Sequence, residues 1–139
     1  ISRGDKSGTD NKEKSLWKNL GGVPEKQSWY QQSGQGMLAS IKIAEEKKGV
    51  ILTDRGTYIK YEANEKGKPN LVIVNEGDDS LKNFYSVIAT NPKHCKNVNY
   101  TEASKFIKWV TSDKTLNFIA DFKLLNKPLF VIDAKTRKD

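Results

Sequence analysis

The sequence predicts an α/β layered domain, and two observations carry this prediction. Segments with apolar residues at helical spacing alternate along the chain with short runs of aliphatic and β-branched residues. Such alternation of helix and strand is the pattern of α/β layers. The chain has 139 residues, of which 36% are hydrophobic and 29% charged. These values are ordinary for a globular protein with a core of its own.

Three helices are predicted in the first half of the chain. The first begins at the Asp10-x-x-Glu13 capping pattern and ends at Gly21-Gly22, since glycine commonly follows the last helical turn. The second follows Ser33-Gly34 and ends near Gly49, and the third is a short helix capped by Asp54. Helical spacing predicts that their inward residues are Leu16, Trp17 and Leu20, then Met37, Leu38, Ile41 and Ala44, and then Tyr58, Ile59 and Tyr61.

Four short apolar runs are predicted as strands because turn residues bound them. They are residues 50–53, 71–74, 84–90 and 129–132.

Two further helices are predicted between the last two of these strands. Thr101 is the expected cap of the first, and Ser112 or Asp113 is the expected cap of the second. The polar residues 133–139 are expected to fray. The inward residues of the two helices are predicted to be Ala103, Phe106, Ile107, Val110, Leu116, Ile119 and Phe122.

Composition argues against several classes of function. The net charge of +7 favours anionic partners. The lysines are interleaved with acids, however, and no RNP-like, zinc-finger or basic heptad pattern is present, so a nucleic-acid partner is not predicted. No run approaches the roughly 20 apolar residues of a membrane span. The single cysteine, Cys95, excludes an internal disulfide, and His94 beside it has no second histidine to complete a metal or catalytic set.

The residues from Ile1 to Thr9 have the composition of an anion-binding loop before a helix. A helix start leaves backbone N–H groups without partners and carries partial positive charge. Glycines allow close approach of the backbone, hydroxyls add neutral donors, and the guanidinium of Arg3 fits a tetrahedral oxyanion. A capped turn is the alternative reading of Ser7-Gly-Thr9.

A set of motifs extends this reading over most of the chain. They are Ser2-Arg-Gly-Asp-Lys-Ser-Gly-Thr9, Trp29-Tyr30, Ser33-Gly-Gln-Gly-Met37, Leu52-Thr-Asp-Arg-Gly-Thr-Tyr58, Asn75-Glu-Gly-Asp78 and Tyr85-Ser-Val-Ile88. In this order they resemble the extracytoplasmic tungstate-binding proteins of tungstate ABC importers. The resemblance implies a periplasmic-binding-protein-like fold of two three-layer α/β lobes, with the oxyanion in the cleft. It also implies that the chain is partial, with the N-terminal lobe segment absent.

The resemblance also implies a domain division and a function. Residues 1–78 are expected to form the second, ligand-cleft lobe, and residues 79–139 to cross over and complete the first lobe; one compact domain is the alternative. The implied function is binding of tungstate, without a cofactor, for delivery to the membrane permease of an ABC importer. The implied location is periplasmic, or extracytoplasmic on a cell-surface lipoprotein. Unpaired strand edges near residues 84–90 are expected to cause self-association.

Ligand-binding residues are carried over from the resemblance. In the family pattern Arg3 faces the oxyanion, and Ser2, Ser7, Gly8 and Thr9 belong to the same loop. Asp5 is expected to orient Arg3 or a backbone amide, because a carboxylate that points at tungstate would repel it.

Two other loops before helices are weaker candidates for contact with an anion. Ser33-Gly-Gln-Gly36 could present amides, and Thr53 and Arg55 have suitable side chains, although an Asp54–Arg55 ion pair is an alternative. Relatives usually have His where this chain has Asp10, an acid that slightly opposes an anion at the same helix end.

Two alternatives to tungstate binding stay open. Molybdate, phosphate or sulfate are other ligands for the same fold, and molybdate is nearly isosteric with tungstate. A small hydrolase acting on an anionic substrate through Ser7 or Ser33 is the alternative of another class. Neither a Gly-x-Ser-x-Gly elbow nor a phosphate-binding Gly-x-x-x-x-Gly-Lys-Ser/Thr loop is present, so no enzyme activity is predicted.

Overall fold

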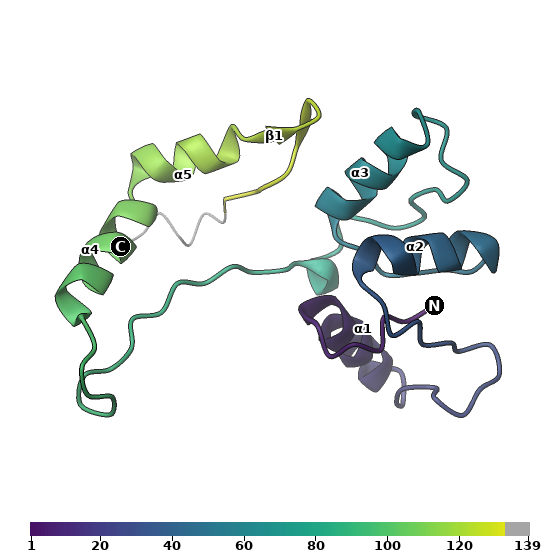
Figure 1. Cartoon of the computed structure of the whole chain (residues 1–139), viewed down its shortest axis with the longest axis horizontal. Helices are drawn as coiled ribbons and strands as arrows, with labels where there is room; N and C mark the ends of the chain where they lie inside the picture. The colour runs from purple at the N-terminus through teal and green to yellow at the C-terminus, as the bar shows by residue number, and fades with distance from the viewer. Residues whose placement is uncertain (133–139) are drawn as a thin grey trace. The chain divides into compact units, whose positions relative to one another are not determined.

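The computed structural model describes residues 1–132, which Figure 1 shows as a ribbon. The chain divides into two compact units, residues 1–82 and 83–139, and each unit is described by itself. This division lies close to the predicted change of lobe between residues 78 and 79, while the assignment of the two parts to lobes stays a prediction. The expected fraying of residues 133–139 lies outside the described residues.

Three helices form the first unit, as the sequence predicts. They are α1 (Gly8–Asn19), α2 (Met37–Glu46) and α3 (Arg55–Asn64), followed by the short 3₁₀ helix η1 (Asp79–Leu81). The predicted start of α1 at Asp10 is wrong, because Ser7 is the cap and its hydroxyl accepts the amide of Asp10 at 3.3 Å. Asp54 caps α3 as predicted, with the amide of Thr57 at 2.8 Å.

The C-terminal ends of α2 and α3 are closed by the same backbone device. Lys48 and Lys66 follow the last helical turns in the left-handed conformation, with φ of 50° and 54°. The next residue in each case is a glycine, whose N–H reaches back to the carbonyl of Ala44 at 2.8 Å in α2 and of Glu62 at 2.9 Å in α3. This hydrogen-bonded stop explains why α2 ends shortly before the predicted Gly49.

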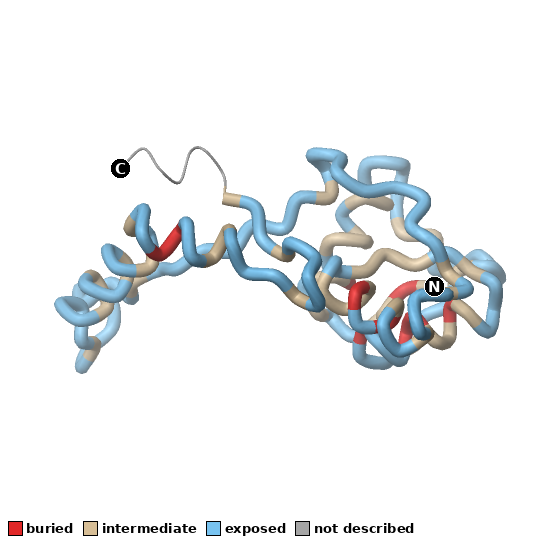
Figure 2. Tube along the Cα trace, turned by 90° about the horizontal axis from the view of Figure 1, so that it is seen from above, coloured by how far each residue is buried: buried red, intermediate tan, exposed pale blue. Residues whose placement is uncertain are grey.

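The core of the first unit lies between α2 and α3. Met37, Ile41 and Tyr61 are buried together, and Ile51, Tyr58 and Leu71 pack against them. Figure 2 shows that buried segments gather in residues 1–82, with one short buried stretch in α5 of the second unit. Ala44 and Ile59 are also buried, as predicted, whereas the inward predictions for Leu20 and Leu38 are wrong, since these side chains are 77% and 40% exposed.

The four predicted strands do not form in the residues that the structure describes. The only described ladder is the hairpin of β1 (Lys123–Leu124) and β2 (Lys127–Pro128). Leu125 and Asn126 make its turn with positive φ, which a two-residue hairpin favours. A strand exists only through hydrogen bonds to a neighbouring strand. Residues 50–53, 71–74, 84–90 and 129–132 have no such neighbour among the described residues.

The second unit holds α4 (Tyr100–Val110) and α5 (Asp113–Ala120) before this hairpin. The predicted cap Thr101 is wrong, because the Asn99 side chain accepts the amide of Glu102 at 3.2 Å. Ser112 caps α5, as one of the two predicted choices. Leu116 is buried as expected, but the predicted inward residues Phe106 and Phe122 are 52% and 45% exposed.

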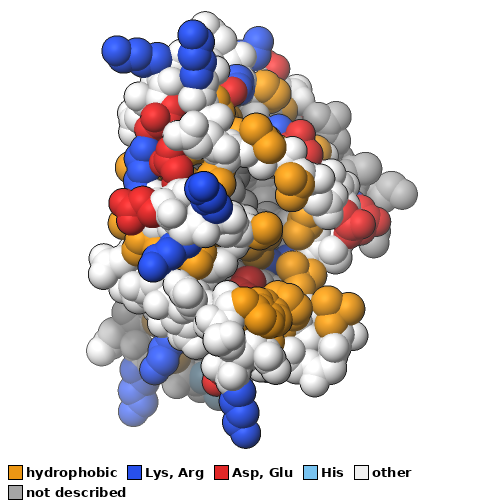
Figure 3. All heavy atoms as spheres, turned by 90° about the vertical axis from the view of Figure 1, so that its right-hand side faces the viewer, with side chains coloured by type: hydrophobic (Ala, Val, Ile, Leu, Met, Phe, Trp, Pro, Cys, Tyr) orange, Lys and Arg blue, Asp and Glu red, His pale blue; other side chains and the backbone are white. Residues whose placement is uncertain are grey.

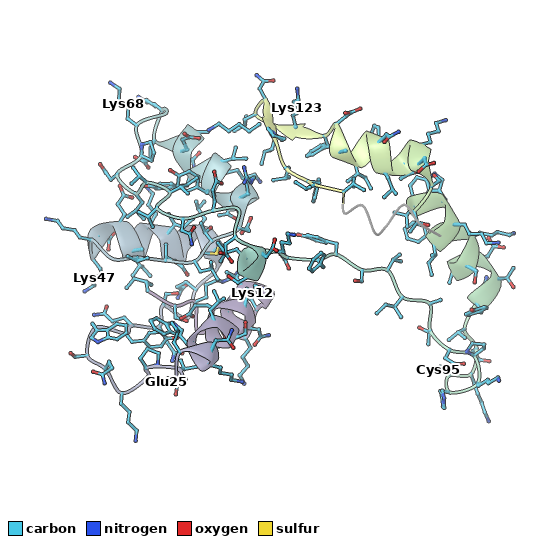
Figure 4. The ribbon with its side chains drawn as sticks, turned by 180° about the vertical axis from the view of Figure 1, so that it is seen from behind. Lys12, Glu25, Lys47, Lys68, Cys95 and Lys123 are labelled. Atoms are coloured by element: carbon cyan, nitrogen blue, oxygen red, sulfur yellow. The ribbon has the colours of Figure 1, made fainter. Side chains whose placement is uncertain are left out.

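The surface carries both apolar and charged side chains. Val72, Val74, Phe84 and Ile88 are among the large hydrophobic residues left exposed. Figure 3 shows hydrophobic side chains on one face, among lysines and acids. Lys47 and Lys68 extend away from the ribbon in Figure 4, as a solvated surface predicts. Among the described residues, no helix combines the length and the apolarity that a membrane crossing requires.

Candidate functional site

The candidate site is the loop of residues 2–7 and the first turn of α1. Ser7 uses its hydroxyl oxygen to accept the Asp10 amide, so the cap satisfies one of the orphan donors at the helix start. The amides of Gly8 and Thr9, the first two residues of α1, have no acceptor within the part of the chain that the structure describes. These two donors sit at the positive end of the helix, where an anion binds favourably.

Arg3 adds a permanent positive charge to this end of the helix. Its guanidinium forms an ion pair with Asp5, and the Arg3 side chain is only 17% exposed. The Nε atom of Arg3 is buried without a hydrogen-bond partner among the described residues. A buried donor without a partner is costly, so this guanidinium has unused capacity for an acceptor.

Asp5 lies where the sequence predicts that it orients Arg3 or an amide, and it contacts both. It pairs with the Arg3 guanidinium and accepts the Ser7 amide at 3.1 Å. Hydrogen bonds from Ser7, followed by those from Arg3, hold the pKa of the Asp5 carboxyl below its ordinary value. Asp5 therefore stays ionised at neutral pH and keeps Arg3 in place.

The loop of residues 31–34 supports the candidate site from beside it. Ser2 donates its amide to Gln31 at 2.8 Å, and the amides of Ser33 and Gly34 donate to Ser2 and Arg3 at 2.9 and 2.8 Å. The sequence makes the Ser33-Gly-Gln-Gly36 segment a candidate for direct contact with an anion. In the structure its first two amides instead hold the backbone of Ser2 and Arg3.

Close packing against this second loop restricts Gly4. Its φ is +63°, and an added Cβ would lie 2.8 Å from the Cβ of Gln32. Any residue with a side chain at position 4 would therefore be strained in conformation and too close to its neighbour.

Asp10 turns back into the loop of residues 2–7. Its carboxylate is 1% exposed and accepts the amides of Gly4 at 3.1 Å and Lys6 at 3.0 Å, with the Lys14 ammonium at 3.1 Å. Burial by itself raises the pKa of this carboxyl, but the Lys14 ammonium and the two amides outweigh burial and lower the pKa. Asp10 thus stabilises the fold at neutral pH, and this contribution is lost as the pH falls through the lowered pKa.

The Glu13 carboxylate is the centre of a polar network that the sequence did not predict. The indole of Trp17 and the hydroxyls of Tyr30 and Ser2 donate to its carboxylate, at 2.5, 3.0 and 2.5 Å. Burial, together with the Glu13 carboxylate, raises the pKa of Tyr30, so its hydroxyl keeps the proton that it donates. The spacing of Glu13 and Trp17, four residues apart on one helix face, is the signal that could have indicated the contact between them.

The structure brings together only some of the predicted site residues. Ser2, Arg3 and Thr9 line one shallow depression with Ile1, Asp10, Glu13 and Leu52. Thr53 and Arg55 lie at the start of α3 and have other partners. The hydroxyl of Thr53 donates to the Asp54 carbonyl at 3.2 Å, and Arg55 pairs with Glu76 at 2.9 Å rather than with Asp54.

Substitution of Thr9 tests whether its hydroxyl serves a ligand. Ser7 is the cap of α1, and the Thr9 hydroxyl makes no hydrogen bond in the described part of the chain. We expect Thr9→Val to lower oxyanion affinity in the full-length protein while the unliganded melting temperature stays the same, because shape is kept and only a donor is lost. Calorimetric titration and thermal unfolding measure the two quantities. Unchanged affinity would remove Thr9 from the site.

Comparisons with known proteins identify the family of this chain. Residues 1–114 match a family model described as a PBP superfamily domain. The chain is 38% identical over 136 residues to the tungstate-binding protein TupA of Peptoclostridium acidaminophilum, covering 96% of this chain and 46% of that protein. It is 32% identical over 144 residues to a putative ABC transporter anion-binding protein of Haloferax volcanii, covering 96% of this chain and 39% of that protein.

Solved structures show the same relationship. The tungstate binding protein TupA of Desulfovibrio alaskensis G20 is 55% identical, with a TM-score of 0.84 over 92% of this chain and 52% of that one. The tungstate ABC transporter structure from Geobacter sulfurreducens is 40% identical, with a TM-score of 0.63 over 88% and 50%. The chain therefore spans about half the length of the relatives it matches. The predicted fold class is confirmed, and the chain belongs to the PBP superfamily, the periplasmic-binding-protein-like proteins.

Proposed function

We propose that this chain contributes one side of an oxyanion site, and that the ligand is tungstate. The observation that carries the proposal is the Arg3 guanidinium, which pairs with Asp5 and whose buried Nε has no partner among the described residues. Arg3 lines the same depression as Thr9, and the amides of Gly8 and Thr9 have no acceptor in the described part of the chain. A dianion that leaves water needs such charge-assisted donors. Relatives named for tungstate binding, at 38% and 55% identity, support the choice of ligand.

The proposal extends to transport. Relatives of this chain are described as an ABC transporter anion-binding protein and as a tungstate ABC transporter. We therefore propose that the bound oxyanion is delivered to the membrane permease of an ABC importer, that the protein works outside the cytoplasm, and that binding requires no cofactor. A hydrolase is the alternative function, but the Ser7 hydroxyl caps a helix and the Ser33 hydroxyl contacts Ser40 at 2.7 Å.

Calorimetric titration of the full-length protein tests the ligand. Tungstate, molybdate, sulfate and phosphate are titrated separately, and release of product from generic phosphate and carboxylate esters is assayed in parallel. The proposal expects tungstate to bind tightly, sulfate and phosphate to bind weakly, and no ester to turn over. Tight binding of phosphate but not tungstate would identify phosphate as the ligand. Ester turnover would indicate a hydrolase instead of a binding protein.

A further expectation concerns residues 1–139 studied alone. In two-lobed binding proteins, donors from both lobes hold the ligand and exclude water. This chain spans only about half the length of its relatives. We expect residues 1–139 to bind tungstate much more weakly than the Desulfovibrio alaskensis protein, and to self-associate through exposed apolar residues such as Phe84 and Ile88. Calorimetry and light scattering on both proteins check this. Equal affinity in a monomeric chain would show a complete site.

A further inference from the structure

Asp10 occupies the inside of the candidate loop, and its contacts are different in kind from a helix cap. Its carboxylate is 1% exposed and accepts the amides of Gly4 and Lys6, which lie four to six residues earlier in the chain. The Lys14 ammonium balances its charge from the next turn of α1, at 3.1 Å. The acid therefore binds the loop to the helix, and its charge is largely neutralised by the protein itself.

The two amides that Asp10 accepts belong to the residues that give the loop its shape. Gly4 and Lys6 have φ of 63° and 60°, in the left-handed region that costs a residue with a side chain about 1 kcal/mol or more. A hydrogen bond from an amide to a carboxylate is among the stronger ones in proteins. The contact with Asp10 therefore offsets the strain at Lys6 and selects this loop conformation over others.

Gly4 and Lys6 are the neighbours of Asp5, the residue that pairs with Arg3. Asp5 lies between Gly4 and Lys6 in the chain and pairs with the Arg3 guanidinium while it accepts the Ser7 amide. When the amides on both sides of Asp5 are fixed, the direction in which its side chain leaves the backbone is fixed too, and the contacts with Arg3 and Ser7 hold the carboxylate. Asp10 thus acts on Arg3 through the backbone, without touching it.

We propose that Asp10 is a positioning residue for oxyanion binding, which holds the loop of residues 2–7 in its binding shape from the inner side. This inference rests on the proposed function, because it assigns a role within the same site. It reverses the expectation from helix electrostatics, under which an acid in the first turn only weakens an anion at that end. The sign of the effect on affinity therefore separates the two roles.

Asp10→Asn is the test, because it keeps the size of the side chain and removes its charge and one of its two acceptors. If Asp10 positions the loop, the binding-competent fraction falls, and a fall to about one fifth raises the apparent Kd for tungstate about fivefold. Amide hydrogen exchange, measured by NMR without ligand, should show faster exchange at Gly4 and Lys6. Asp79→Asn is the matched control, since Asp79 begins η1, its side chain is 88% exposed and it pairs with Lys82 just after η1. Both readouts should stay as in the wild type.

The outcomes distinguish this inference from the proposed function. Weaker tungstate binding with faster exchange at Gly4 and Lys6 supports the positioning role. Equal or tighter binding by Asp10→Asn overturns it, as does unchanged exchange at these two amides, whether or not tungstate binds. Absence of tungstate binding by the full-length wild-type protein would count against the proposed function. The exchange result would in that case still show whether Asp10 holds the loop.

Discussion

Arg3→Ala is expected to weaken tungstate binding at least tenfold in the full-length protein. The Arg3 side chain is 17% exposed, and its buried Nε has no partner among the described residues, so a ligand oxygen would be its acceptor in a largely dehydrated place. A hydrogen bond to a charged group contributes about 1.5 to 3 kcal/mol, and about 1.4 kcal/mol corresponds to a tenfold change in Kd. Isothermal titration calorimetry measures the loss, and circular dichroism checks that the helices persist.

Arg55→Ala is the comparison for this experiment. Arg55 carries the same charge at the start of another helix, but it is 53% exposed and its partner is Glu76. Exposed ion pairs contribute little, so we expect the affinity of Arg55→Ala to stay within about threefold of the wild type. Equal losses in the two variants would mean that net charge governs binding, and unchanged affinity in Arg3→Ala with native-like circular dichroism would remove Arg3 from the site.

Ile41→Ala is expected to destabilise the first unit by about 2 to 5 kcal/mol, the usual cost of such a truncation in a packed core. Ile41 is 1% exposed in the cluster with Met37 and Tyr61 that joins α2 to α3. Urea denaturation followed by circular dichroism should therefore show an earlier transition.

Leu38→Ala in the same helix is the matched control for Ile41→Ala. Leu38 is 40% exposed although its spacing predicts an inward position, so its truncation should cost less than about 1 kcal/mol. Similar losses of stability in the two variants would show that the α2–α3 contact does not form the core in solution.

The helices and their ends could largely be predicted from the sequence, because the sequence signals for them are local. Capping residues, glycines after the last turn and apolar spacing all act within a few residues. The predicted first residues of two helices are nonetheless wrong. Asp10 and Thr101 have the right chemistry for a cap, but Ser7 and Asn99 lie three and two residues earlier and receive the bonds instead.

The predicted strands failed for a reason that sequence patterns do not contain. Residues 71–74 are all apolar and three of the four are β-branched, yet Val72 and Val74 are 68% and 80% exposed. A strand requires a neighbour at the right register to accept its hydrogen bonds. Among the described residues, a ladder forms only in the hairpin of Lys123–Leu124 and Lys127–Pro128, and a single parallel bridge joins Ser2 to Gln32.

The candidate site was likewise predictable only in part. The sequence by itself predicted a candidate anion-binding loop with Arg3 before a helix, because residue types and their order specify the donors that such a loop requires. Only the tertiary structure showed that Asp10 faces inward, that Glu13 binds Trp17 and Tyr30, and that Arg55 pairs with Glu76. The direction of a side chain depends on contacts with residues far along the chain. Those contacts decide whether an acid in the first turn of a helix faces the helix end or, as Asp10 does, turns back to the amides of the preceding loop.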